Sequence, residues 1–373
     1  MSGEQVVAQR VRQVITESGL SQAEFAAKAG LDGPKMSKSL SGVRRFTSLD
    51  LARIAEVGGV TVDYLLGSEV PAPTAAARSV VACSADVAVD KARELAQLRS
   101  DLAFLGYPQS RRSVGARPKT GRLIDQGARL AAEAVAFAQG QGHDPCHNRD
   151  LGDLVEKVFG IDVAAAELPD GFDGLAWTDA NTQLILVGTS RVAARQRFTI
   201  AHELGHLLAG DDQQIHVDTD LYAEEHRKKP SEIRANAFAS AFLLPEGCLQ
   251  TEVTGIDWSP EAFAKLVCRL WVSPSTLAWR LLNLGLINAR QCTGFRQMSY
   301  AQAAERAGQM DAFAEWIGKA SSPSVPLALV RDTYRAYADG KSTLRPFAKL
   351  LGIDTDTLRQ TLDEVWEEPR LTP

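Results

Sequence analysis

The residue types best suited to catalysis lie in one stretch, Arg197–Gly210, which reads RFTIAHELGHLLAG. It contains two histidines four residues apart, His202 and His206, with Glu203 directly after the first. The surrounding residues favour a helix and include no proline, so both imidazoles lie on one helical face and can reach a single cation. Glu203 then lies beside the open coordination position, where a carboxylate can act as general base toward water. This H-E-x-x-H spacing predicts a catalytic metal site.

A catalytic zinc site usually takes three protein ligands, and the chain offers several candidates for the third. Glu232 begins a second helical pattern, EIRANAFASAFLLP, which can carry its carboxylate across the first helix. Asp212 is an alternative, because an aspartate can also bind zinc. Asn236, one turn after Glu232, is expected to orient a ligand from behind. The remaining candidate ligands and oxyanion donors follow the motif: His216, Asp218, Asp220, Tyr222, Glu224, Glu225 and His226.

Short strands are expected to precede the motif helix and to position it. Residues 161–165, 174–177 and 183–187 are apolar runs separated by turns rich in Pro, Gly and Asn. Together with flanking helical patterns they predict an α+β zincin-like domain over residues 123–292, with a small antiparallel or mixed sheet. A strand edge beside the motif helix could hold an extended peptide through main-chain hydrogen bonds.

Residues 1–68 predict an all-α head of helix-turn-helix type. Ser21 and Glu24 fit a capping box, the helix that follows stops at Gly30, and a second short helix runs from Pro34 to Leu40. Two short helices joined by a glycine-containing turn are typical of DNA-binding heads, in which the second helix enters the major groove. The residues expected to face bases or phosphates are Gln22, Lys35, Ser37, Lys38, Arg44 and Arg45.

Two further segments complete the predicted organisation. Residues 69–122 begin as a tether rich in Pro and Ala and contain one helical pattern, 86–104, which either packs on the next domain or mediates homodimerisation. Residues 293–373 predict an all-α C-terminal region.

Composition limits the possible classes of protein. The chain is 45% hydrophobic and 23% charged, values of a globular protein, and its net charge of −5 excludes a generally basic nucleic-acid coat. No apolar run approaches the roughly 20 residues that span a bilayer, so a cytoplasmic protein without membrane contact is expected. Five cysteines without a C-x-x-C pair predict reduced thiols. The irregular group His143, Cys146 and His147 is not expected to bind metal.

Two families share these motifs. The stretches RQRFTIAHELGH and EIRANAFASAFLLP resemble the ImmA/IrrE metallopeptidases, over residues 123–290. The segments LSQ, SKSLSG and DYLLG of the head resemble the XRE/lambda-repressor-like family. The first resemblance implies His202, His206 and Glu232 as metal ligands and Glu203 as general base. The second implies a five-helix domain that reads the major groove.

Together these signatures predict a DNA-binding transcriptional regulator with a zinc-dependent endopeptidase domain, Mn2+ being the alternative metal. Its expected protein substrate is an XRE-type repressor, another regulator or the chain itself. The alternative is a non-catalytic DNA-binding regulator that uses the peptidase fold as a sensor or dimerisation scaffold.

Overall fold

The computed structural model divides the chain into two compact units, Met1–Ala76 and Ala77–Pro373. Each unit has a hydrophobic core of its own. The structure describes residues 3–18, 20–58, 60, 65, 82–112, 114, 120–168, 172–211, 216–218 and 229–364.

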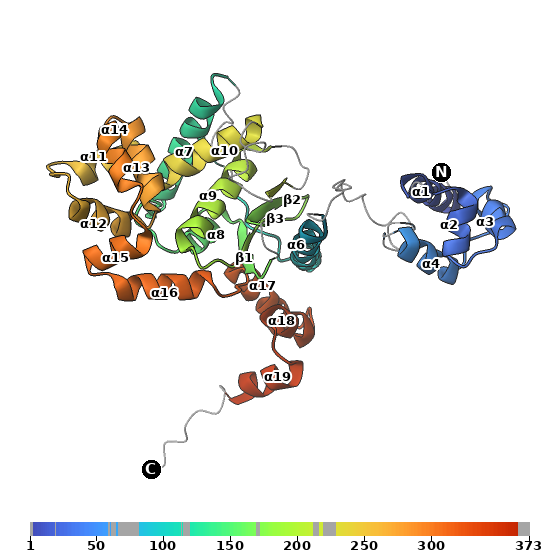
Figure 1. Ribbon diagram of the computed structural model, residues 1–373. Coiled ribbons are helices and arrows are strands. Elements are labelled where there is room, and N and C mark those ends of the chain that lie inside the picture. The colour runs from blue at the N-terminus through green and yellow to red at the C-terminus, as the bar shows by residue number, and fades with distance from the viewer. Residues whose placement is uncertain are drawn as a thin grey trace, which may run out of the picture. The chain divides into compact units, whose positions relative to one another are not determined.

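The first unit is helical in its described parts, as predicted (Figure 1). Ser21 and Glu24 form the expected capping box at the start of the second helix, and a proline lies in the first turn of the third. A short turn containing Gly30, whose φ is +62°, joins these two helices. Phe25, Met36 and Ile54 are fully buried at the centre. The helices are α1 (Gly3–Glu17), α2 (Gln22–Lys28), α3 (Gly33–Leu40) and α4 (Ser48–Gly58).

A small sheet lies in the middle of the second unit (Figure 1). Its order is β1-β3-β2-β4, with β1 parallel to β3 and the other pairs antiparallel, so the predicted small sheet is confirmed and is mixed. The turn between β2 and β3 is held by Asp179, whose carboxylate accepts from the backbone N–H groups of Asn181 and Thr182. The strands are β1 (Asp162–Ala166), β2 (Gly174–Thr178), β3 (Gln183–Gly188) and β4 (His216–Asp218).

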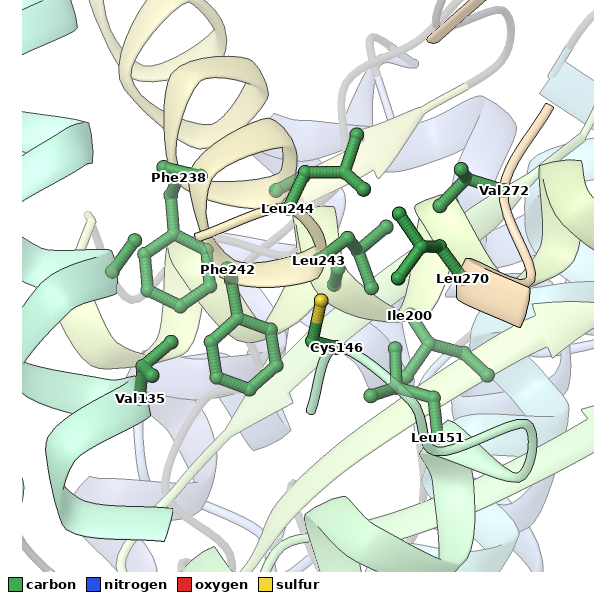
Figure 2. Packing of buried hydrophobic residues seen from close by; sticks show 14 of the residues in the cluster. Val135, Cys146, Leu151, Ile200, Phe238, Phe242, Leu243, Leu244, Leu270 and Val272 are labelled. Atoms are coloured by element: carbon green, nitrogen blue, oxygen red, sulfur yellow. The ribbon is translucent and has the colours of Figure 1, made fainter. Parts of the chain in front are cut away.

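Four helices form the layer that carries the predicted motifs. They are α7 (Leu123–Gly140), α8 (Leu151–Phe159), α9 (Ala193–Ala209) and α10 (Pro230–Leu243). Phe238 and Phe242 of α10 stack with ring centroids 5.3 Å apart, and Figure 2 shows them among the buried side chains of this core. Cys146 lies in the same core cluster (Figure 2).

The helix α6 (Ala82–Phe104) packs on the sheet of the second unit. Its Leu95 and Leu102 contribute to the cluster that contains Leu184 and Leu186 of β3. Arg99 of α6 is buried and donates to both carboxylate oxygens of Asp162, at 2.6 and 2.8 Å, and to Asp332 at 2.7 Å. This charged network ties α6 to β1 and to the C-terminal region.

The part of the second unit that follows α10 is helical, and it includes the described part of the predicted all-α C-terminal region, residues 293–373. Ser273 caps the helix Pro274–Asn283 by accepting from Thr276 N–H at 3.1 Å, with Pro274 in the first turn. Within the described parts of the chain, no helix combines the length and apolar composition needed to cross a membrane. The helices are α11 (Glu246–Val253), α12 (Pro260–Leu270), α13 (Pro274–Asn283), α14 (Ala289–Phe295), α15 (Tyr300–Ala307), α16 (Met310–Ala320), α17 (Leu327–Ala338), α18 (Leu344–Leu351) and α19 (Thr355–Glu364).

The prediction of reduced thiols is wrong for one pair of cysteines. Cys146 and Cys248 form a disulfide, although they lie 102 positions apart in the sequence. Cys268 and Cys292 are buried free thiols. Spacing could not reveal the pair, because only the packing of α11 beside the loop between α7 and α8 brings the two sulfurs together.

Candidate metal centre

The helix α9 presents the motif side chains to the interior. His202 and Glu203 are fully buried and His206 is 2% exposed. The helix ends at Gly210, whose φ of +62° gives the left-handed cap that favours glycine. The fold therefore keeps all three chemically active side chains of α9 out of bulk water.

Glu232, in the first turn of α10, meets both histidines. Its Oε2 lies 3.2 Å from His202 Nε2, and its Oε1 lies 3.4 Å from His206 Nε2. The two Nε2 atoms are themselves 3.0 Å apart. One donor atom from each residue falls within a group no wider than 4.8 Å. Two imidazoles and one carboxylate, converging in this way, are a donor set that fits a catalytic zinc site.

The close approach of α10 to α9 depends on a glycine of the motif. A Cβ added at Gly205 would lie 2.9 Å from Cδ1 of Phe238, closer than real Cβ atoms come to their neighbours. The glycine within H-E-L-G-H thus provides the space in which α10 packs against α9. That packing places Glu232 over the two imidazoles.

Electrostatics at the cluster follow from burial and pairing. Burial raises the pKa of Glu232, but the hydrogen bonds and positive charge of His202 and His206 outweigh this effect and hold the pKa well below its usual range. The carboxylate is therefore ionised, which is the form that binds a metal.

Asp211 makes a contact that the sequence did not indicate. Its Oδ2 lies 3.0 Å from His206 Nδ1, and its other oxygen forms an ion pair with Arg234 of α10. Because Nδ1 is engaged by a carboxylate, the ring turns its Nε2 toward Glu232. The signal available in the sequence was the position of Asp211 directly after Gly210, where the left-handed cap turns the chain back over the last helical turn.

Glu203 lies on the sheet side of the cluster. A Cβ added at Gly174, the first residue of β2, would be 3.4 Å from Glu203 Oε1. The carboxylate is therefore next to the beginning of β2. On its outer side this strand pairs with β4, where Gly174 is opposite Asp218.

The structure describes only some of the other candidate ligands and supporting residues. Asn236 is half-buried on α10, and its orienting role stays a prediction. His216 and Asp218 belong to β4, where only the backbone is described. The remaining candidates lie outside the described residues: Asp212, Asp220, Tyr222, Glu224, Glu225 and His226.

In the first unit, the candidate DNA contacts lie on and around α3. Lys35, Ser37 and Lys38 are exposed on this helix, and Gln22 is exposed at the start of α2. Arg44 is only half-exposed, because it pairs with Asp50 at 2.9 Å and donates to Ser39 Oγ at 3.1 Å. Arg45 is exposed in the same turn.

The cluster lies in a segment that resembles a known family. Residues 156–282 match a peptidase family described as the IrrE N-terminal-like domain. This segment, the IrrE-like domain, is similar to that family. It contains the whole of α9 and α10, and hence all four residues of the predicted site.

Two curated relatives of the IrrE-like domain carry the name radiation response metalloprotease IrrE. The protein of Deinococcus radiodurans is 32% identical over 157 residues, which cover 41% of this chain and 43% of the relative. That of Deinococcus deserti is 30% identical over 155 residues, covering 41% of this chain and 52% of the relative. The match thus spans about half the length of these relatives.

Proposed function

We propose that this chain is a DNA-binding transcriptional regulator whose IrrE-like domain is a zinc-dependent endopeptidase. Its substrate is another regulator of the XRE repressor type or the chain itself, and it acts in the cytoplasm. The observation that carries the proposal is the convergence of His202, His206 and Glu232 inside a domain whose relatives are named metalloproteases.

The donor atoms of the cluster define where a metal would be held. His202 Nε2, His206 Nε2 and the carboxylate of Glu232 are the ligands, with Zn2+ as the metal and Mn2+ as the alternative. A bound Zn2+ would supply Lewis acidity toward a peptide carbonyl and lower the pKa of water to about 7. Asp211 holds the ring of His206 in place for this role.

Glu203 performs the proton transfers. Its buried carboxylate lies one residue from His202 on α9 and beside the start of β2. It takes the proton of the attacking water and later passes it to the leaving amine of the cleaved peptide bond. Its burial excludes bulk water, which strengthens its interaction with the charge that develops during the reaction.

The first unit supports the DNA-binding half of the proposal. Its second and third helices follow each other across a short turn, and α3 exposes Lys35, Ser37 and Lys38 along one element. Positive and hydrogen-bonding side chains on such a helix suit contacts to phosphates and base edges.

The enzymatic half is tested with the purified full-length chain loaded with zinc. Wild-type protein is incubated alone and with candidate XRE-type repressors, and cleavage is followed by mass spectrometry. We expect Glu203→Gln to keep its metal and to lose cleavage by about two to four orders of magnitude, the range for removing a general base. Glu133→Gln, a change at an exposed position on α7, is the matched control.

The outcome also separates the two functions considered. If the wild type and Glu203→Gln leave every substrate and the chain itself equally intact while metal is bound, the endopeptidase proposal fails. The non-catalytic regulator then becomes the better description. Loss of metal in a His202→Ala, His206→Ala double variant checks the ligand assignment independently of turnover.

A further inference from the structure

A second group of potential metal ligands lies outside the candidate centre. The sulfurs of Cys146 and Cys248 and one ring nitrogen of His147 fall within 4.8 Å of one another. Cys146 and His147 belong to the loop between α7 and α8, and Cys248 belongs to α11. The group shares no residue with the His202, His206 and Glu232 cluster.

The imidazole of this group is surrounded by negative charge. Asp144 Oδ2 lies 2.6 Å from His147 Nδ1, and Glu252 Oε1 lies 3.0 Å from His147 Nε2. The surroundings of the ring therefore favour a cation.

The loop is anchored without help from the disulfide. Arg197 of α9 is 2% exposed, and its guanidinium donates to Pro145 O at 2.7 Å and to Asn148 O at 3.1 Å, on either side of Cys146 and His147. A loop held in this way keeps its ligand-bearing side chains near α11 when the sulfur–sulfur bond is broken. His147 is exposed, so a metal ion or a reductant can approach from its side.

We propose that Cys146, His147 and Cys248 bind a divalent metal such as Zn2+ when the two cysteines are reduced. The disulfide and the bound metal are then alternative states of the same site. Two thiolates and one imidazole are a soft donor set that selects Zn2+ over Mg2+ or Ca2+. When one ring nitrogen binds the metal, the other keeps its carboxylate partner, an arrangement common at protein zinc sites. A carboxylate oxygen of Glu252 or a water completes four-coordination.

Conversion of the disulfide into the metal-bound dithiol requires a reductant. A dithiol reductant gives two electrons and two protons to the Cys146–Cys248 bond, which yields two thiols and the disulfide of the reductant. Metal binding then displaces the two thiol protons, because thiolates are the ligands. An oxidant of the disulfide class reverses the first step and releases the metal. In reducing compartments such disulfides are usually transient or redox-sensing, which fits this exchange.

Cobalt titration of the full-length chain tests the proposal. Metal-free protein is either reduced with a dithiol and freed of it under argon, or left oxidised, and then titrated with Co2+. We expect thiolate-to-cobalt charge-transfer absorption in the reduced protein and none in the oxidised protein. The band should persist in the His202→Ala, His206→Ala variant, which separates this site from the candidate centre, and in the control Cys292→Ser.

A Cys146→Ser, Cys248→Ser double variant should lose the band and bind one fewer metal ion than the reduced wild type. A reduced wild-type chain without the band would overturn the proposal, as would a double variant that retains it.

A second measurement needs no variant, in case the double variant fails to fold. The reduced wild type is alkylated with and without Zn2+, and each cysteine is followed by mass spectrometry. Zn2+ should slow alkylation of Cys146 and Cys248 together, while the buried Cys292 should be unaffected. Equal rates with and without Zn2+ at Cys146 and Cys248 would contradict the proposal. Neither measurement depends on peptidase activity.

Discussion

Asp211 controls the orientation of one imidazole in the candidate centre. It engages His206 Nδ1 at 3.0 Å and is itself paired with Arg234. We expect Asp211→Ala to weaken zinc binding by about 10–100-fold, the range for losing a carboxylate behind a ligating histidine. Competition against a fluorescent chelator measures the affinity.

The control for this prediction is Asp311→Ala, which removes an exposed carboxylate on α16. Circular dichroism of both variants verifies that the fold is retained. An Asp211→Ala protein that folds and binds zinc as tightly as the wild type would show that the carboxylate does not support the ligand.

The residues of the candidate centre could be predicted to very different extents. His202, Glu203 and His206 lie within five residues of sequence, so helical periodicity alone puts them together. Glu232 could be proposed from its helical pattern, but its meeting with the histidines depends on the packing of Phe238 against Gly205.

Asp211 escaped prediction because its contact depends on the left-handed turn at Gly210. The pairing of Cys146 with Cys248 escaped it for a different reason. Two residues that are 102 positions apart meet only through tertiary packing, which no local pattern encodes.

Arg197 joins α9 to two other segments. Besides the loop before α8, its guanidinium reaches the carbonyls of Leu270 and Trp271, both at 3.2 Å, at the end of α12. Burial lowers the pKa of Arg197 to about 10, which is still above neutral pH. The guanidinium therefore stays charged in the interior, where these carbonyls accept its hydrogen bonds. This one side chain therefore fixes the start of the motif helix against the remainder of the core.

We expect Arg197→Met to destabilise the second unit by about 3–5 kcal/mol, because it leaves several buried carbonyls without a donor. The measurement is urea denaturation followed by tryptophan fluorescence, with Arg290→Met at an exposed position as the control. A loss no greater than that of the control would mean that water or a shifted backbone satisfies these carbonyls.

The order of the strands illustrates what elements alone do not specify. Apolar runs separated by turn residues predict three strands near their observed positions. The parallel pairing of β1 with β3, however, places β3, the last of these three strands in sequence, between β1 and β2. Hydrophobic periodicity sets which face of a strand is buried but carries no information on its neighbour, so both antiparallel and mixed sheets were compatible with the sequence.

Glu156 lies where the IrrE-like domain meets the C-terminal helices. Its Oε1 accepts from Val163 N–H of β1, and its Oε2 accepts from Ala328 N–H of α17, both at 3.2 Å. Burial, with a smaller contribution from the charge of Asp162, raises the pKa of Glu156 to about 7. An unfolded chain would ionise this group near pH 4.5, the ordinary value.

This difference makes stability depend on pH in a defined direction. Between about pH 4.5 and 7 the folded state holds more protons than the unfolded state, so the contribution of Glu156 to stability falls as pH rises and levels off above pH 7. We expect a loss of roughly 1–3 kcal/mol across this window, reduced from the full shift by partial exposure. Glu156→Gln should abolish it.

The measurement is the free energy of unfolding of wild type and Glu156→Gln at pH 5, 7 and 8.5. The amide of the variant fits less well against the two N–H donors, but this cost is the same at each pH. The informative quantity is therefore how the difference in unfolding free energy between wild type and Glu156→Gln changes with pH. Glu133→Gln should parallel the wild type at all three values. A difference between wild type and Glu156→Gln that stays constant with pH would contradict the assigned shift.

The exposed lysines of α3 are the residues of the first unit best placed to contact DNA phosphates. Lys35 and Lys38 are exposed on α3, whereas Arg44 is paired with Asp50, so the two lysines are the cleaner test of phosphate contact. Affinity for DNA falls as salt rises, with a slope of log affinity against log salt of about −0.9 for each phosphate contact. If both lysines contact phosphates, the Lys35→Ala, Lys38→Ala double variant should therefore have a slope that is less negative by about 1.8. Fluorescence anisotropy with the full-length chain and a generic duplex measures this slope. Lys265→Ala, at an exposed position on α12, should leave it unchanged, and an unaltered slope in the double variant would exclude α3 from the DNA interface.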